Sequence, residues 1–261
     1  MNFFEKILYF FQKEMERPNP YGWFHLLWIL LSILAVVFLY LRRKNYSEKQ
    51  LKVVLGIYGI TALILELIKQ LIWSFNYENG VVTWDYQWYA APFQLCTTPI
   101  YVSLICLFLK KGKLRNSLLA YVAYITIFGS IATAIMPDSC FVRTIEVNIH
   151  TMFLHFGSLV LSIYLMINEV KPTKKNFVGA LKIFLGFVFI ALLLDIVIYH
   201  SGILGEETFN MFFISPYFIS TLPVYDKMQE ILPYPIYLLF YLLTISIGGY
   251  VVYFIHKKIK K

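Results

Sequence analysis

The stretch GWFHLLWILLSILAVVFLYLRRK, residues 22–44, is a long apolar run that ends at three consecutive basic residues. A helix needs about twenty apolar residues to cross a hydrocarbon core of ~30 Å. The run does not alternate between polar and apolar residues, so it favours a helix over a strand of a β-barrel. It therefore predicts a transmembrane helix, and the basic residues mark the side on which that helix ends.

Blocks of the same kind recur along the chain, in which hydrophobic residues make up 59% and charged residues 15%. Short loops separate them, and no internal repeat is visible. We predict an all-α polytopic membrane protein with one domain, residues 1–261. Its seven transmembrane helices are predicted at 22–41, 53–75, 91–109, 117–136, 145–167, 177–199 and 234–255.

The distribution of the 23 lysines and arginines orients the predicted helices. Most of them lie in the loops after the first, third and fifth spans and in the C-terminal tail. Cytoplasmic loops hold the excess of basic residues, so we predict the N-terminus outside and the C-terminus inside. The net charge of +8 is then a signal of topology, and it implies no nucleic acid and no soluble protein partner. We expect the bacterial cytoplasmic membrane as the location.

Two segments outside the spans carry apolar residues. Residues 1–21 place apolar side chains at helical spacing among charges, which predicts a helix lying in the outer interface. The segment lacks the features of a signal peptide. Residues 201–233 are apolar in part but broken by prolines, which predicts a cap or re-entrant segment over the outer mouth.

Polar residues inside the spans converge on the outer side. Ionisable groups are costly in a membrane and usually face the interior of a bundle, so they mark candidate sites. The predicted topology places nearly all of them in the outer halves of the spans. They are His25, Glu66, Lys69, Gln70, Gln94, Cys96, Thr97, Thr98, Asn148, His150, His155 and Asp195, with His200 just beyond its span. This convergence predicts a polar cavity that opens outward.

Several of these residues also have a structural interpretation. Glu66 and Lys69 lie three apart on one helical face, which favours an ion pair between them. Thr97 can bond to its own backbone. His150 and His155 are five residues apart and point about 140° away from each other. We expect His155 to line the cavity and His150 to lie at its rim.

The cysteines at positions 96, 106 and 140 form no metal-binding pattern. A disulfide between Cys96 and Cys140 is compatible with the predicted topology, but we expect two thiols. A zinc site built from a histidine and a carboxylate would lack any recognised ligand spacing. We therefore expect no metal and no cofactor.

Five stretches, in this order, carry a family resemblance: YGWFHLLWILL (21–31), PFQLCTTP (92–99), NIHTMFLHFGSLVL (148–161), FNMFFISP (209–216) and LPYPIYLL (232–239). Together they resemble the seven-helix integral-membrane family that includes bacterial YwaF-type proteins and vertebrate transmembrane protein 164. The resemblance covers nearly the whole chain.

The resemblance implies a function for the outer cavity. The vertebrate member is described as an acyltransferase that remodels phospholipids through a cysteine nucleophile, and distant relatives are membrane hydrolases that use a threonine and a histidine. Matched to this chain, Cys96 takes the place of the nucleophile and His155 that of the base. Asn210 and Pro216 match the family's Asn and Pro before the last span. Family members often have His where this chain has Gln94.

A lipid acyltransferase or acyl hydrolase follows as the leading hypothesis, with membrane lipids as the partner. In it, His155 activates Cys96, and Asp195 or Glu66 orients the imidazole. Amide and hydroxyl groups donate hydrogen bonds to the developing oxyanion. The candidate residues for binding substrate are His25, Glu66, Lys69, Gln94, Thr97, His150 and Asn210.

Two other classes of function fit the same pattern. A transporter, or a membrane protein that binds a lipid or solute, would use the outer half of the bundle as its site. The inner halves of the spans offer little polar lining for such a path. In a non-catalytic scaffold, the polar cluster would only pack helices together.

Overall fold

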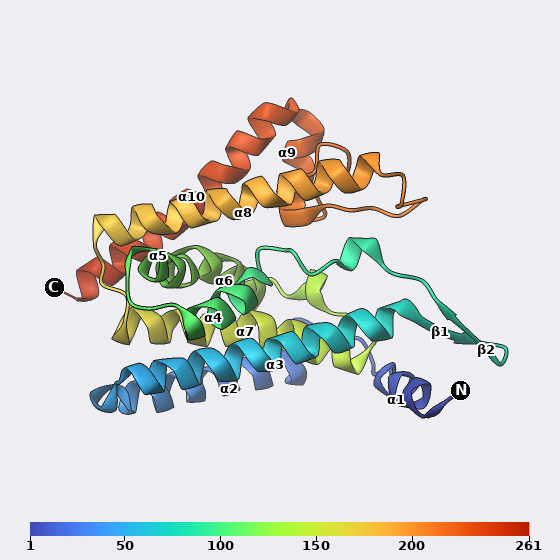
Figure 1. Cartoon of the computed structure of the whole chain (residues 1–261), viewed down its shortest axis with the longest axis horizontal. Helices are drawn as coiled ribbons and strands as arrows, with labels where there is room; N and C mark the ends of the chain where they lie inside the picture. Colours follow the sequence, from blue (N-terminus) through green and yellow to red (C-terminus); the bar gives the residue numbers. More distant parts are fainter. Residues whose placement is uncertain (261) are drawn as a thin grey trace.

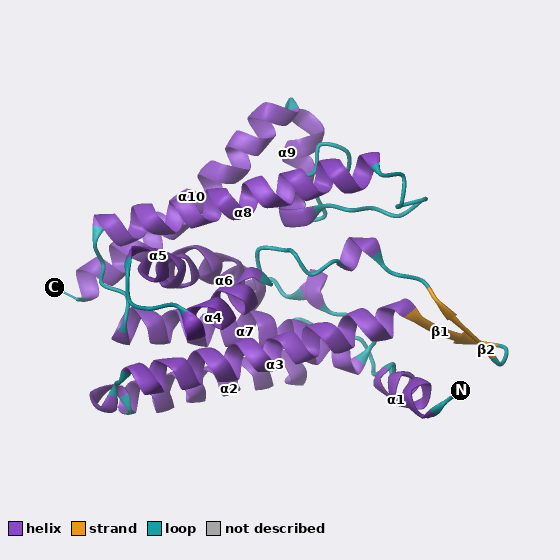
Figure 2. Ribbon diagram, in the orientation of Figure 1, coloured by secondary structure: helices purple, strands orange, loops and turns teal. Residues whose placement is uncertain are grey.

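The computed structural model describes residues 1–260 and, of Ser139, only the backbone. Within that range, six helices are long and apolar enough to cross a membrane. They are α2 (Trp23–Leu41), α3 (Glu48–Ser74), the continuous helix Lys113–Ile135, α7 (Ile145–Asn168), α8 (Lys174–His200) and α10 (Tyr234–Ile259). These helices form one elongated bundle (Figures 1 and 2). The predicted helical, multi-pass architecture is confirmed; Lys261 lies outside the described residues.

The third predicted span differs from its prediction. Helix α4 covers only Thr98–Phe108, and residues 91–97 are irregular. Pro99 lies in the first turn of α4, where its missing N–H is tolerated. Eleven residues rise about 16 Å, roughly half of a hydrocarbon core. The predicted helix over 91–109 is therefore wrong for its first seven residues. Proline interrupts a helix there, so this part of the chain forms hydrogen bonds with neighbouring segments instead.

The N-terminal helix, α1 (Phe3–Phe11), is shorter than predicted. Asn2 and Glu5 form a capping box at its start. Beyond its end, the chain is extended and pairs with the segment before α7, where the Met15 amide donates to the Arg143 carbonyl at 2.9 Å. Leu8 is buried in a small cluster with residues of α3 and α7. These contacts dock α1 on the bundle.

A β-hairpin follows α3 where the sequence analysis expected a loop. Strands β1 (Phe75–Glu78) and β2 (Val81–Trp84) are antiparallel. Asn79 and Gly80 both have positive φ, at 51° and 83°. This is the turn that an Asn-Gly pair favours between two strands. The hairpin and α1 mark one end of the bundle, here called the hairpin end (Figure 1).

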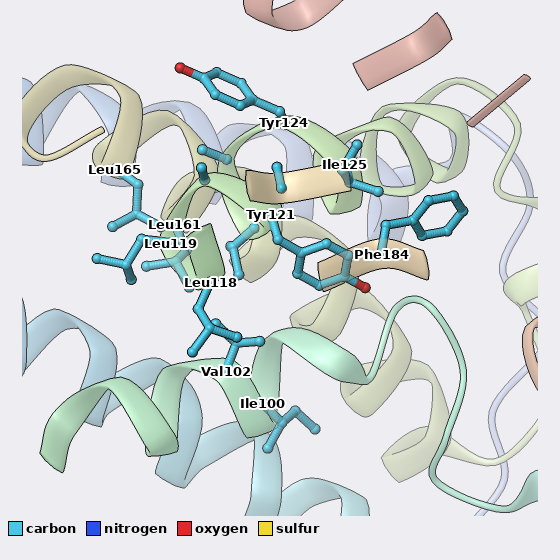
Figure 3. Packing of buried hydrophobic residues seen from close by; sticks show 14 of the residues in the cluster. Ile100, Val102, Leu118, Leu119, Tyr121, Tyr124, Ile125, Leu161, Leu165 and Phe184 are labelled. Atoms are coloured by element: carbon cyan, nitrogen blue, oxygen red, sulfur yellow. The ribbon is translucent and has the colours of Figure 1, made fainter. Parts of the chain in front are cut away.

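The centre of the bundle is the continuous helix made of α5 (Lys113–Tyr121), the π-helical turn η3 (Val122–Thr126) and α6 (Ile127–Ile135). Figure 3 shows its Tyr121 and Ile125 among apolar side chains from α4, α7 and α8. The π-turn leaves the Val122 carbonyl open to the Ser162 hydroxyl of α7 at 2.8 Å. A Cβ at Gly249 of α10 would lie 3.0 Å from the Tyr124 carbonyl oxygen, so only glycine permits this close approach.

The opposite end, here called the basic end, carries the loops after α2, α4 and α7 and the end of α10. Arg115 is buried there, with its guanidinium 2.7 Å from Glu48 and 3.7 Å from Glu169. The Tyr46 hydroxyl donates to Glu169 as well. A buried arginine between two carboxylates joins the start of α3, the start of α5 and the end of α7.

The remaining elements are short. They are the single turns η1 (Arg43–Asn45), η2 (Trp88–Ala90), η4 (Asp138–Cys140) and η5 (Met211–Phe213), and the helix α9 (Tyr225–Ile231). In the segment 201–233, which the sequence predicts to be a cap, Met211 and Phe212 are fully buried. The segment folds back on the bundle between α8 and α10 (Figure 1).

Candidate functional site

Most of the buried ionisable side chains lie at the hairpin end. They come from the last third of α3, the first turns of α2 and α7, and the last turns of α8. The buried members are His25, Glu66, Lys69, Glu146, His150 and Asp195. The sequence predicted that such groups converge at one end, and the structure brings part of them into direct contact.

Glu66 is the centre of the largest group. Its carboxylate lies 2.7 Å from the Lys69 ammonium and 2.8 Å from Nε2 of His150. The Gln70 amide donates to the same carboxylate at 2.8 Å. Lys69 also donates to the Ala90 carbonyl at 3.1 Å. The predicted ion pair between Glu66 and Lys69 is confirmed, and His150, which comes from α7, joins it.

His150 lies inside this group and not at its rim. The side chain is 3% exposed. Nε2 is held by Glu66, while Nδ1 is buried and has no hydrogen-bond partner among the described residues. A carboxylate that holds one ring nitrogen fixes the orientation and tautomer of the imidazole. Glu66 therefore orients His150, whereas the sequence analysis expected Glu66 or Asp195 to orient His155.

Glu146 is a member of the site that the sequence analysis missed. It lies in the first turn of α7, is 6% exposed, and is within electrostatic range of Lys69 and Glu66. Neither of its carboxylate oxygens has a hydrogen-bond partner among residues 1–260. A glutamate at a helix start is common because it complements the helix dipole, so its position in the sequence gives no sign of burial.

The electrostatic field of the group around Glu66 extends beyond the helices. Tyr86 lies in the loop between β2 and η2, outside the apolar helices. Burial raises the pKa of the Tyr86 hydroxyl, and the negative charge of Glu66 adds to the shift. The negative charge of Glu66 therefore reaches a residue of the loop before η2.

Cys96 lies on the irregular segment before α4. Its side chain is partly exposed, and its thiol is within electrostatic range of Glu66, Lys69 and Cys140. The neighbouring Thr97 hydroxyl donates to the Gln94 carbonyl at 2.9 Å, as the structural interpretation of Thr97 expected. No disulfide joins Cys96 to another described cysteine.

His155 has different neighbours. Its Nδ1 lies 3.1 Å from the Thr133 hydroxyl of α6, and the Cys140 thiol donates to that hydroxyl at 3.9 Å. In the part of the chain that the structure describes, no hydrogen bond joins His155 to Cys96 or to Asp195. The structure thus connects His155 with Cys140 through Thr133.

Gln94, Asn210 and Asp195 all form hydrogen bonds with one stretch of backbone, residues 210–219. Gln94 donates to the Asn210 carbonyl at 2.9 Å and accepts from the Phe212 amide at 2.7 Å. Asp195 accepts from the Met211 amide at 2.7 Å. Asn210 accepts from the Ser215 amide at 2.8 Å and donates to carbonyls at 218 and 219.

These bonds stabilise an unusual turn. Phe212 and Phe213 have φ of 57° and 59°, a left-handed conformation that is costly for an aromatic residue. The amide groups of Gln94 and Asn210, which the sequence analysis assigned to substrate, are used here by the fold. The family motifs PFQLCTTP and FNMFFISP are therefore brought into contact with each other.

Replacing Gln94 by leucine is expected to lower the free energy of unfolding by about 2 kcal/mol, because it leaves the Phe212 amide and the Asn210 carbonyl without partners. Thermal melting in detergent measures this change, and limited proteolysis within 201–224 reports loosening of the turn. Gln87→Leu is the matched control, since the Gln87 side chain is bonded, within residues 1–260, only to the nearby Asp85 carbonyl. Equal behaviour of the two variants would contradict the role of Gln94.

His25 stands apart from the Glu66 group. It is fully buried, its Nδ1 accepts from the Tyr21 amide at 3.1 Å, and its ring packs near Phe141 and Phe156. Its Nε2 is buried without a hydrogen-bond partner in the described range. Within residues 1–260, no three His, Cys, Asp or Glu side chains are grouped so that they could hold a metal ion.

Comparison with known proteins agrees with the motifs. No curated protein and no solved structure matches the chain. A sequence model described as the TMEM164 family matches residues 20–253, a range that holds the six long helices almost completely, together with Cys96, His150 and His155. Because this match extends over most of the chain, the protein belongs to the TMEM164 family.

Proposed function

We propose that the protein is a membrane-embedded lipid acyltransferase or acyl hydrolase with Cys96 as nucleophile and a histidine as base. The observation that carries this proposal is the contact between the segment that bears Cys96 and the buried group of Glu66, Lys69 and His150: Lys69 donates to the Ala90 carbonyl of that segment at 3.1 Å. Such groups are costly inside a membrane protein and concentrate at functional sites. The resemblance to acyl-transferring relatives points to the same cysteine.

The proposed chemistry proceeds through an acyl-cysteine. The base takes the thiol proton, and the sulfur of Cys96 attacks the ester carbonyl of a lipid. When the tetrahedral intermediate collapses, the carbon–oxygen bond breaks and the leaving alcohol takes the proton from the imidazolium. Water then attacks the thioester to release a fatty acid, or the hydroxyl of a second lipid attacks it to form a new ester. Neither route needs an oxidant, a reductant or a cofactor.

We assign the base to His155 because of the motif resemblance and keep His150 as the second candidate. In His155 only Nδ1 is bonded to a described residue, the hydroxyl of Thr133. His150 has the carboxylate that usually orients a catalytic imidazole. Asp195 acts in this proposal as a positioning residue, because its carboxylate holds the backbone of Met211. Labelling of Cys96 in the variants His155→Gln and His150→Gln distinguishes the two histidines.

A groove supports a lipid as the substrate. It lies between α2, α3 and α7, has a volume of about 300 Å³, and is lined almost entirely by apolar side chains. One of its lining residues, Tyr58, is within electrostatic range of Cys96, and another, Phe156, packs near His25. An acyl chain is the part of a lipid that fits such a surface.

We also propose the orientation in the membrane. The short α4 forms the third of seven crossings, completed by residues 91–97, whose irregular backbone is tolerated because it packs against protein. The N-terminus lies outside and the C-terminus inside, since the basic end holds most of the lysines and arginines. The site then faces lipids of the outer leaflet, in a bacterial cytoplasmic membrane.

Labelling with a thiol-reactive acyl probe tests the function. The purified full-length protein is labelled and its peptides are mapped across Cys96, Cys106 and Cys140. Selective labelling of Cys96 that is lost in His155→Gln and kept in His150→Gln supports His155 as the base; the reverse pattern assigns the base to His150. Equal labelling of all three cysteines would overturn it. Solute uptake by reconstituted vesicles that depends on Asp195 and not on Cys96 would favour a transporter.

A further inference from the structure

A second groove lies at the basic end, away from the candidate site. It is formed by α6, α7 and α10 and has a volume of about 370 Å³. Its walls are mostly isoleucine side chains, including Ile131, Ile163 and Ile255. Ile131 and Ile255 are 37% and 51% exposed, so the groove opens on the outer surface of the bundle, where lipid surrounds a membrane protein.

The polar residues of this groove stand together at one end of it. They are His256 and Lys260, one helical turn apart at the end of α10. Among the described residues, no aspartate or glutamate lines the groove. Lys257 and Lys258 follow His256 directly and are exposed. The groove is therefore apolar along its length and positively charged at its mouth.

Lys260 has free hydrogen-bond donors for a ligand, and His256 lies one turn before it. The Lys260 ammonium donates one hydrogen bond, to the Ile167 carbonyl at 3.0 Å, and has three protons to donate. His256 is 6% exposed, and its Nδ1 lies 2.9 Å from the Tyr124 hydroxyl. Its Nε2 is buried and makes no hydrogen bond of standard geometry to a described residue. The Met166 backbone also interacts with the His256 ring, so the free hydrogen-bond donors at the mouth of the groove are those of the exposed Lys260 ammonium.

We infer that this groove binds an anionic glycerophospholipid, with an acyl chain against the isoleucines and its phosphate at Lys260 and His256. Charge complementarity selects this occupant: a basic pocket between transmembrane helices recognises anionic head groups, and a neutral lipid would leave the charge at the mouth unmatched. The site is independent of the proposed acyl transfer, which lies at the hairpin end.

Native mass spectrometry of the full-length protein tests this inference. The protein, in neutral detergent, is titrated with phosphatidylglycerol or with phosphatidylcholine of the same acyl chains. We expect wild type to retain phosphatidylglycerol preferentially. Lys260→Gln should bind it about fivefold more weakly, the effect of one charge near a membrane surface. Binding of phosphatidylcholine should not change.

Three controls make the result specific. Lys49→Gln removes an exposed charge from α3 and should leave binding of phosphatidylglycerol as in wild type. Ile163→Trp fills the groove and should weaken binding of both lipids. Soluble glycerol phosphate should not compete; if it does, the site binds phosphate and not a lipid. Equal retention of the two lipids by wild type, or an equal loss in Lys49→Gln and Lys260→Gln, would overturn the inference.

Discussion

Replacement of Cys96 by alanine is expected to lower turnover of a lipid ester by about a thousandfold or more, because removing a nucleophile removes the covalent route itself. The measurement is release or transfer of a labelled acyl group by purified protein in mixed micelles. Melting of the variant should stay close to that of wild type, since Cys96 is only partly buried and the change removes one heavy atom. A loss of turnover without a loss of stability is the expected result.

Cys106→Ala is the matched control. Cys106 is fully buried in α4, so the same substitution there removes a thiol that no lipid reaches. Cys140→Ala is the informative third variant, because Thr133 connects Cys140 with His155. Full activity of Cys96→Ala together with an inactive Cys140→Ala would identify Cys140 as the nucleophile. Full activity of all three variants would contradict cysteine catalysis.

Replacement of Glu66 by glutamine is expected to lower the free energy of unfolding by about 3 kcal/mol, and Tm by roughly 5–10 °C. Lys69 is 7% exposed, and the substitution leaves its ammonium without the carboxylate 2.7 Å away. Breaking a buried ion pair costs more than the pair contributes, because one charge stays buried without compensation. Thermal melting in detergent micelles measures the loss.

The double variant Glu66→Gln/Lys69→Met should regain most of that stability, because it removes the uncompensated charge together with its partner. Glu230→Gln is the control: Glu230 and Lys227 have the same spacing, but both are exposed and 3.6 Å apart, so the effect should stay under about 0.5 kcal/mol. A double variant no more stable than Glu66→Gln would show that the ion pair is not the source of the loss. A stable double variant with reduced acylation of Cys96 would assign the pair to the chemistry.

The long helices were predictable because each depends on local information. In α7 and α10 the apolar runs begin where the sequence predicts, at residues 145 and 234. The start of α4 was not predictable in the same way. The first turns of the predicted helix are replaced by an irregular segment. In it, the Gln94 side chain forms hydrogen bonds with the backbone of Asn210 and Phe212, more than a hundred residues away.

The sequence by itself determined a multi-pass helical membrane protein and the end of the bundle at which its ionisable residues gather. Both depend on hydropathy and charge along the chain, which act over about twenty residues and need no partner. Only the tertiary structure decided that Glu66 bonds to His150 and that Thr133 connects His155 with Cys140. A hydrogen bond needs two atoms within about 3 Å, and residue spacing on separate helices does not determine that distance until the helices pack.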